Sequence, residues 1–157
     1  MAKEIERKFL VRSDGWQDQV TKATRLQQAY VASMDDRSVR VRLENGSAAT
    51  LTIKIGTSLI RDEFEYAIPA PDAEELMQAA VGLVIRKTRH LVPFGGHTWE
   101  IDVFEGAHQG LVVAEVELDE AGDTLELPDW LGEEVTGQFR YSNQALATQY
   151  GQDDHGL

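Results

Sequence analysis

Polar and apolar residues alternate along most of the chain, and a period of two residues is typical of β-strands. Alternating runs cover residues 4–9, 25–32, 38–43, 50–55, 61–68, 84–92, 97–104 and 111–118. Asn45-Gly46 separates two of these runs and Gly95-Gly96 separates two others, which favours hairpins because these residues tolerate positive φ. The pattern predicts about eight strands in a mainly antiparallel sheet.

Helical patterns are short by comparison. We expect helices or helical turns at residues 13–23, 71–81, 128–131 and 142–150. The clearest is 71–81, where Asp72 is the expected N-cap and Gly82 the expected stop. The chain is therefore predicted to be an α+β protein in which strands dominate.

The alternation also sorts the charged residues onto one side of the strands. That side collects seven cations and eight anions, namely Lys8, Arg40, Arg42, Lys54, Arg61, Lys87, Arg89, Glu4, Glu6, Glu63, Glu65, Glu100, Asp102, Glu115 and Glu117. The opposite side is apolar, with residues such as Ile5, Val41, Ile53, Ile101 and Val116. A sheet that needs only a soluble face does not require so many charges of both signs, so the charged face is a candidate for chemistry.

Two arrangements of the sheet fit this pattern. In an open sheet the charged face meets water and the apolar face packs on the helices. In a closed eight-stranded barrel, the few helices can cover the apolar outside only if the charged face lines a lumen with room for one small ligand. Such a lumen has to be wet and neutralised, by divalent cations on its carboxylates and by a phosphate-rich anion on its arginines.

The ordered set of charged motifs resembles the CYTH superfamily, also called triphosphate tunnel metalloenzymes. It begins with Glu4-x-Glu6-x-Lys8 and continues through Arg40-x-Arg42, Lys54, Glu63-x-Glu65, Lys87-x-Arg89, Asp102 and Glu115-x-Glu117. The resemblance spans residues 3–150. It implies a closed eight-stranded tunnel with a charged lumen and helices packed outside, which hydrolyses or cyclises a triphosphate with Mg²⁺ or Mn²⁺.

The resemblance also implies roles for individual residues. The positions that match triphosphate-binding residues are Lys8, Arg40, Arg42, Lys54, Lys87 and Arg89. The positions that match metal-binding carboxylates are Glu4, Glu6, Glu115 and Glu117, with Asp102 as a further metal candidate. Glu63, Glu65 and Asp102 are candidates for second-metal, water-positioning or ion-pairing groups.

A hydrolase of this kind needs a group that activates water. Glu63 or Glu65 is one candidate base. Lys87 is another, because neighbouring cations such as Arg89 are expected to lower its pKa. Tyr30 follows polar Gln28 on its strand, and we expect it to face inward and pair with Lys87 if it is not simply a packing residue.

Composition narrows the setting. The 157 residues carry a net charge of −12, which disfavours binding to nucleic acid or to an anionic membrane. The chain has no cysteine, which excludes a disulfide framework and a thiolate zinc site. We expect a cytoplasmic protein with a single domain at residues 1–150, a flexible tail at 151–157 and a homodimer as one candidate assembly.

The substrate is the most open part of the interpretation. The compact chain has no evident insertion for reading a base, so inorganic tripolyphosphate is the first choice. Thiamine triphosphate hydrolysis and a class IV adenylate cyclase activity are the enzymatic alternatives. The remaining alternative is a module that binds polyphosphate or a nucleotide without turning it over.

Overall fold

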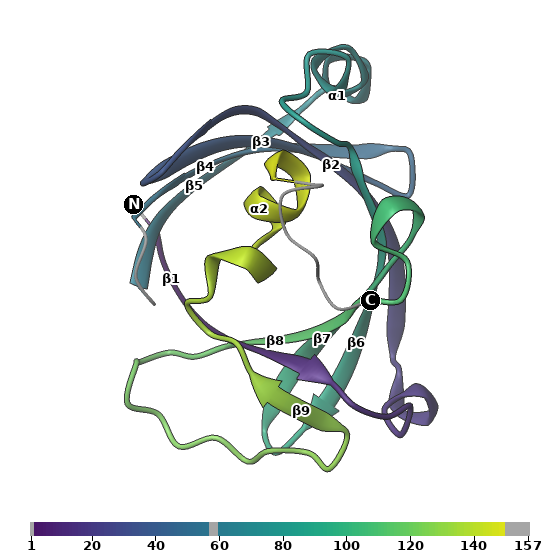
Figure 1. Ribbon diagram of the computed structural model, residues 1–157, viewed down its shortest axis with the longest axis vertical. Coiled ribbons are helices and arrows are strands. Elements are labelled where there is room, and N and C mark those ends of the chain that lie inside the picture. The colour runs from purple at the N-terminus through teal and green to yellow at the C-terminus, as the bar shows by residue number, and fades with distance from the viewer. Residues whose placement is uncertain (1, 57–59, 150–157) are drawn as a thin grey trace.

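A computed structural model of the chain describes residues 2–56 and 60–149, with the side chains of residues 2–4 and 60 outside the description. The predicted flexible tail at 151–157 lies outside the described residues. Within these residues, nine strands form one antiparallel sheet. The strands are β1 Ala2–Val11, β2 Lys22–Met34, β3 Arg37–Glu44, β4 Ala48–Ile55, β5 Ile60–Ile68, β6 Ile85–Phe94, β7 His97–Phe104, β8 Val112–Glu117 and β9 Leu131–Glu134. Figure 1 shows these strands curled into a ring.

The sheet curls into a ring because β1 pairs on both of its edges. Residues 2–5 of β1 pair with residues 60–63 of β5, and residues 6–10 pair with β8. The C-terminal end of β1 pairs with β9 instead of continuing along β5. The predicted ring of eight strands is confirmed. The word "closed" is an overstatement, because β5 pairs with only part of one edge of β1 and β9 takes the rest of that edge.

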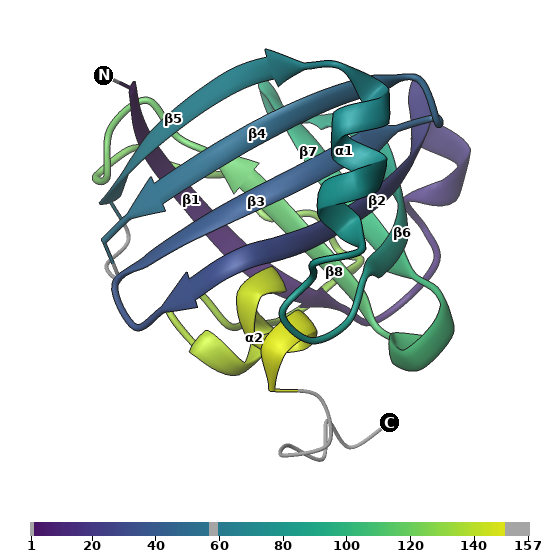
Figure 2. The ribbon, with the colours of Figure 1, turned by 90° about the horizontal axis from the view of Figure 1, so that it is seen from above.

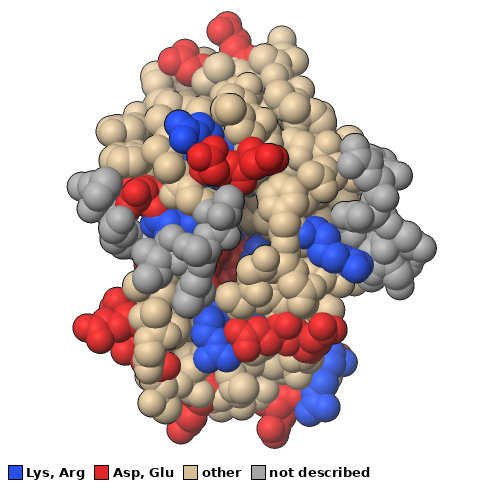
Figure 3. Space-filling view, turned by 60° about the vertical axis from the view of Figure 1, so that its left-hand side comes forward, with Lys and Arg blue, Asp and Glu red and all other residues tan. Residues whose placement is uncertain are grey.

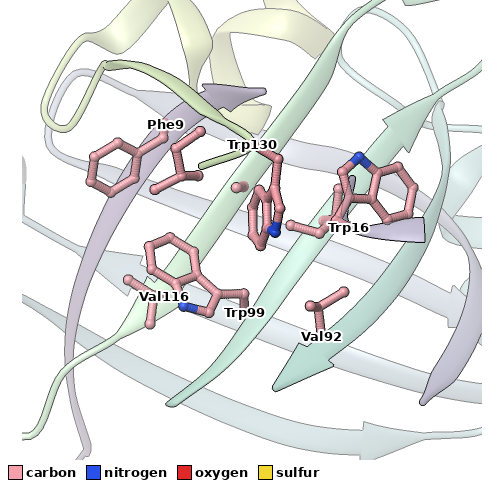
Figure 4. Packing of buried hydrophobic residues seen from close by; sticks show 9 residues of the cluster. Phe9, Trp16, Val92, Trp99, Val116 and Trp130 are labelled. Carbon is pink, nitrogen blue, oxygen red and sulfur yellow. The ribbon is translucent and has the colours of Figure 1, made fainter. Parts of the chain in front are cut away.

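The apolar face of the sheet lies outside, as the barrel interpretation requires. Phe9, Trp99 and Val116 project from the outer face and pack against Trp16 and Trp130, which come from the segments before β2 and before β9 (Figure 4). Trp99 is completely buried, with its ring centroid 5.7 Å from Phe9 and 5.8 Å from Trp130. Chain segments without regular structure, and not only helices, therefore cover this part of the barrel.

The two α-helices occupy different places. The helix α1, Ala70–Met77, lies on the outside of β2, β3 and β4, where its buried Ala73 packs on Leu43 and Ala49 (Figure 2). The helix α2, Asn143–Thr148, sits at one end of the barrel. The prediction that helices pack outside is thus confirmed for α1 and is wrong for α2. No helix in the described part of the chain has the length and apolar character needed to cross a bilayer.

Some local predictions also need correction. The helix predicted at 71–81 is shorter, and its N-cap is Pro69 instead of Asp72, which lies in the first turn. The region 13–23 contains only a 3-10 turn at Gln17–Gln19. A turn does occur near 128–131, but the chain then enters β9, whose four residues have too little alternation to be recognised as a strand.

The helix α2 closes one end of the tunnel with an apolar plug. Leu146 and Ala147 are buried against Tyr30, Phe104 and Val113 on the inner face of the barrel. The plug is also held by hydrogen bonds, because the backbone N–H of Leu83 donates to the Ala147 carbonyl at 2.8 Å. The inner face therefore has an apolar zone under α2 and a charged zone beyond it.

Candidate triphosphate site

The charged zone encloses a cavity of about 220 Å³ in the centre of the tunnel. Side chains from all eight ring strands and from the segment around α2 line it. The predicted site residues on its wall are Glu6, Lys8, Tyr30, Arg40, Arg42, Lys54, Glu63, Glu65, Arg89, Glu115 and Glu117. Figure 3 shows acidic and basic side chains close together on one face of the molecule. The side chain of Glu4 lies outside the described residues, although its backbone pairs with Arg61.

Two opposite strands of the cavity wall carry opposite charges, although cations and carboxylates also lie side by side elsewhere on the wall. In the strand order of the ring, β3 stands opposite β8, with three strands between them on either side. Arg40 and Arg42 project from β3, while Glu115 and Glu117 project from β8. Glu6 extends the acidic side because β1 pairs with β8 in the register that places Glu6 opposite Glu117. The cavity therefore has a basic wall facing an acidic wall.

Glu115 is the most deeply buried carboxyl of the acidic wall. Burial opposes its ionisation, but Lys8 and Arg89 outweigh that effect and hold the pKa of Glu115 well below its ordinary value. The opposite outcome holds at Glu100 on β7, where burial raises the pKa despite the nearby Arg89. The acidic wall thus contains a carboxylate that stays charged beside one that takes up a proton more readily.

The donor chemistry of this wall fits a hard divalent cation. Glu6, Glu115 and Glu117 line the same part of the cavity, on the neighbouring strands β1 and β8. Carboxylate oxygens are the ligands that Mg²⁺ and Mn²⁺ take in proteins. Among the described residues, no three acidic or histidine side chains are close enough to form a ready-made metal site. Glu6, Glu115 and Glu117 are therefore candidates that fit by chemistry and by their position on the wall.

Lys87 and Asp102 do not lie on the cavity wall. They are buried behind Arg89, with 1% and 0% of their surface exposed. Both carboxylate oxygens of Asp102 are engaged, one by Arg89 Nε at 2.8 Å and the other by Lys87 Nζ at 2.6 Å. This arrangement makes Asp102 the counter-charge of two cations, which fits the ion-pairing alternative for this residue better than the metal-ligand alternative.

The Lys87 amine has a strongly altered environment. Burial lowers the pKa of Lys87 to about 7, with Arg89 lowering it further and Asp102 opposing the change. The direction agrees with the sequence interpretation, but burial is a larger cause than the crowding by cations. Within the described chain, Lys87 Nζ donates to Asp102 and, at 3.0 Å, to Asn143 Oδ1, and Tyr30 is not one of its hydrogen-bond partners.

Sequence reasoning missed two polar residues of this region. Asn143 belongs to α2 and reaches Lys87, although 56 residues separate them in the chain. Gln28 is completely buried on the inner face and accepts a hydrogen bond from Arg42 Nε at 3.0 Å. The alternation places Gln28 on the same face as Tyr30, but a neutral amide carries no signal that separates it from a solvated strand residue.

Comparison with known proteins agrees with this architecture. The model of the CYTH domain matches residues 2–150. The chain belongs to the CYTH domain family. An inorganic triphosphatase of Acetivibrio thermocellus is 42% identical over 148 residues, covering 93% of this chain and 94% of the relative. An inorganic triphosphatase of Nitrosomonas europaea is 38% identical over 148 residues, covering 92% and 96%.

A solved structure also supports the CYTH fold. The crystal structure of an inorganic triphosphatase aligns with a TM-score of 0.68 at 35% identity. The alignment covers 94% of this chain and 96% of the other. Near-complete coverage in both directions means that the similarity extends over almost the whole of both chains.

Proposed function

We propose that this CYTH protein hydrolyses a triphosphate, with inorganic tripolyphosphate as the substrate, to pyrophosphate and phosphate. The observation that carries the proposal is the cavity with a basic wall facing an acidic wall. A linear polyanion bound to Arg40 and Arg42 would face the carboxylates across the cavity, and one divalent cation could bind both the polyanion and these carboxylates. The two full-length relatives named inorganic triphosphatases support the choice of substrate.

The basic residues of the cavity bind the substrate in this proposal. Lys8, Arg40, Arg42, Lys54 and Arg89 line the cavity and supply charge-assisted hydrogen bonds to phosphoryl oxygens. They also stabilise the negative charge that spreads over the terminal phosphoryl group during transfer. Lys87 contributes charge from behind the wall, next to Arg89.

The carboxylates Glu6, Glu115 and Glu117, together with Glu4, are the residues that would hold Mg²⁺ or Mn²⁺. A bound divalent cation neutralises phosphoryl oxygens and makes the terminal phosphorus easier to attack. Asp102 is not available for this role while both of its oxygens accept hydrogen bonds from Lys87 and Arg89.

The reaction requires a water molecule in line with the bond between the terminal phosphorus and its bridging oxygen. That bond breaks as the new P–O bond forms, and the base takes the proton of the water. Glu63 and Glu65 lie on the cavity wall, and within the described chain Glu65 has neither an ion pair nor a hydrogen bond that would occupy it. Both are better placed as bases than Lys87, whose amine is buried behind the wall, and Glu65 is the first choice because Glu63 pairs with Lys54 at 3.7 Å.

The roles of Tyr30 and Lys87 as a catalytic pair are a separate proposal. Tyr30 is on the cavity wall, and Lys87 has the lowered pKa that a neutral amine needs. A Tyr30→Phe variant keeps the ring that packs against α2 and removes only the hydroxyl. Turnover equal to that of the wild type would eliminate the pair.

The deciding experiment is phosphate release from tripolyphosphate, ATP and thiamine triphosphate, each with Mg²⁺, Mn²⁺ or EDTA. We expect the fastest release from tripolyphosphate and none in EDTA. Cyclic AMP and pyrophosphate from ATP would favour the cyclase, and binding of all three compounds without release would favour the binding module. Glu4→Ala and Glu6→Ala should abolish turnover with the fold intact, whereas the exposed Glu133→Ala serves as the matched control.

The cellular setting is proposed on composition alone. The strongly acidic chain, with a net charge of −12, is suited to a small-molecule substrate and not to nucleic acid or an anionic membrane surface. A cytoplasmic location, a single domain over residues 1–150 and a homodimer stay predictions.

A further inference from the structure

Most cations of the cavity already have a carboxylate partner. The pairs and their N···O distances are Lys8–Glu115 at 3.8 Å, Lys54–Glu63 at 3.7 Å, Arg61–Glu6 at 2.9 Å, Arg89–Asp102 at 2.8 Å and, behind the wall, Lys87–Asp102 at 2.6 Å. These pairs reduce the attraction of their cations for a further anion. The attraction of the cavity for an anion therefore depends on the cations that are not neutralised in this way.

Arg40 and Arg42 are the exceptions. Neither lies within ion-pair distance of a carboxylate in the described chain, and the only hydrogen-bond partners of their guanidinium groups are neutral. Arg42 Nε donates to Gln28 Oε1 at 3.0 Å, and Arg40 donates to Thr52 Oγ1 at 3.5 Å. Gln28 and Thr52 are 0% and 1% exposed, so both partners are fixed parts of the wall.

This arrangement is costly for the folded protein. Arg42 is half-buried near Arg40 and Arg89, and its partial burial together with these two cations lowers the pKa of Arg42 to about 10. The amide nitrogen Nε2 of Gln28 is buried without a hydrogen-bond partner in the described chain. A glutamate at this position has the same shape, and it would neutralise Arg42 and remove the unpaired amide N–H groups. Stability alone therefore favours Glu at position 28.

We propose that Gln28 is a positioning residue that orients the Arg42 guanidinium toward the acidic wall while leaving its charge uncompensated, and that this sets the affinity for the triphosphate. The inference deepens the proposed function and rests on it. The neutral acceptor holds one edge of the guanidinium through Nε. The other nitrogens stay available for phosphoryl oxygens, to which a guanidinium binds in a fork geometry.

The test is a Gln28→Glu variant, with Gln27→Glu as the matched control. Gln27 is the preceding residue of β2, and its side chain takes the outer face opposite Leu43 and Arg86. Both variants add one negative charge to the same strand at nearly the same place, but only the first adds it beside Arg42. Three measurements are made on each variant. Tripolyphosphate binding is measured by calorimetry in EDTA, kcat and KM are measured with Mg²⁺, and thermal unfolding is followed without ligand.

We expect Gln28→Glu to weaken tripolyphosphate binding by about ten-fold or more, because the new carboxylate competes for Arg42. KM should rise more than kcat falls, and the ligand-free protein should unfold at a temperature equal to or above that of the wild type. Gln27→Glu should change the dissociation constant less than about two-fold, since its charge is outside the barrel and screened by solvent. A purely structural role of Gln28 instead predicts that the weaker binding of Gln28→Glu is accompanied by a lower unfolding temperature, and that result would overturn the inference.

A second variant, Gln28→Leu, separates charge from hydrogen bonding. It removes the acceptor but adds no charge, so we expect its dissociation constant to lie between those of the wild type and Gln28→Glu. Wild-type affinity in Gln28→Glu, or equal weakening in Gln27→Glu, would overturn the inference. If the wild type itself neither binds nor hydrolyses tripolyphosphate, the proposed function is wrong instead, so the two failures are distinguishable.

Discussion

Replacing Asp102 by Asn tests whether this residue is the ion-pair partner of buried cations or a metal ligand. The substitution keeps the shape of the side chain and removes its charge. Asp102 is completely buried and bonded to Lys87 and Arg89, so the variant leaves two buried cations without their main counter-charge. Removing one partner from a buried ion pair typically costs about 3–5 kcal/mol of unfolding free energy.

The pKa of Asp102 gives a second value for the same interaction. Burial raises this pKa, but Arg89 and Lys87 prevail and lower it from 3.8 to about 2. A change of this size corresponds to about 2 kcal/mol of stabilisation. Because the folded-state pKa is the lower one, the stabilisation is complete above pH 3.8 and is lost as the pH falls through about 2. At neutral pH we therefore expect Asp102→Asn to lose about 3 kcal/mol.

The assay is urea unfolding at pH 7 in EDTA, followed by tryptophan fluorescence. Trp16, Trp99 and Trp130 all lie in the outer apolar cluster, so their emission reports loss of the barrel. Glu100→Gln is the matched control because Glu100 also pairs with Arg89, at 3.4 Å, but its side chain is 38% exposed. Because the pKa of Glu100 is raised despite this pair, removing its charge should cost less than about 1 kcal/mol.

The outcome distinguishes the two assignments of Asp102. If Asp102→Asn unfolds with the same free energy as Glu100→Gln, the carboxylate is not what stabilises Lys87 and Arg89. If the variant is more stable than the wild type in EDTA, Asp102 belongs to a group of mutually repelling carboxylates, as expected for a metal ligand. Either result would refute the reasoning from the hydrogen bonds.

Three further substitutions test other parts of the structure. Gly82 has φ +80°, and a Cβ there would collide with the carbonyl of Ala147, so Gly82→Ala should lose more than about 1 kcal/mol and make α2 easier to cleave by a protease. Because the pKa of Lys87 is lowered on folding, the unfolded chain binds more protons than the folded protein between pH 7 and 10.5. The unfolding free energy should therefore rise with pH in that range, and Lys87→Met should abolish the rise. Trp99→Ala should cost about 3–5 kcal/mol of unfolding free energy, because it leaves a cavity in the outer apolar cluster. An unchanged urea midpoint in Gly82→Ala or Trp99→Ala, or an undiminished rise with pH in Lys87→Met, would contradict the corresponding contact.

Much of the barrel follows from short-range rules in the sequence. Alternation assigns Arg40 and Arg42 to one face of their strand and Val41 to the other, because successive side chains of a strand point in opposite directions. The Asn45-Gly46 turn is equally local, and both residues have positive φ, at 50° and 74°. These signals are sufficient to place most of the candidate site on a single charged face.

Other features depend on contacts between distant segments and have no local signal. The strand β9 is recognised only by its pairing with β1, which precedes it by more than a hundred residues. The place of α2 is decided by the apolar inner surface around Phe104, which exists only after the strands have curled. The same holds for Asn143, whose contact with Lys87 depends on the docking of α2.

The sequence by itself determined which residues share the charged face, and with it the chemistry that the face can perform, because a two-residue period is a property of each strand alone. Only the tertiary structure decided which charges neutralise one another. Asp102 bonds with Lys87 and Arg89 behind the wall, whereas Arg42 meets a neutral amide at its edge. Burial and the pairing of strands set these differences, since both depend on how the sheet curls and where the plug docks.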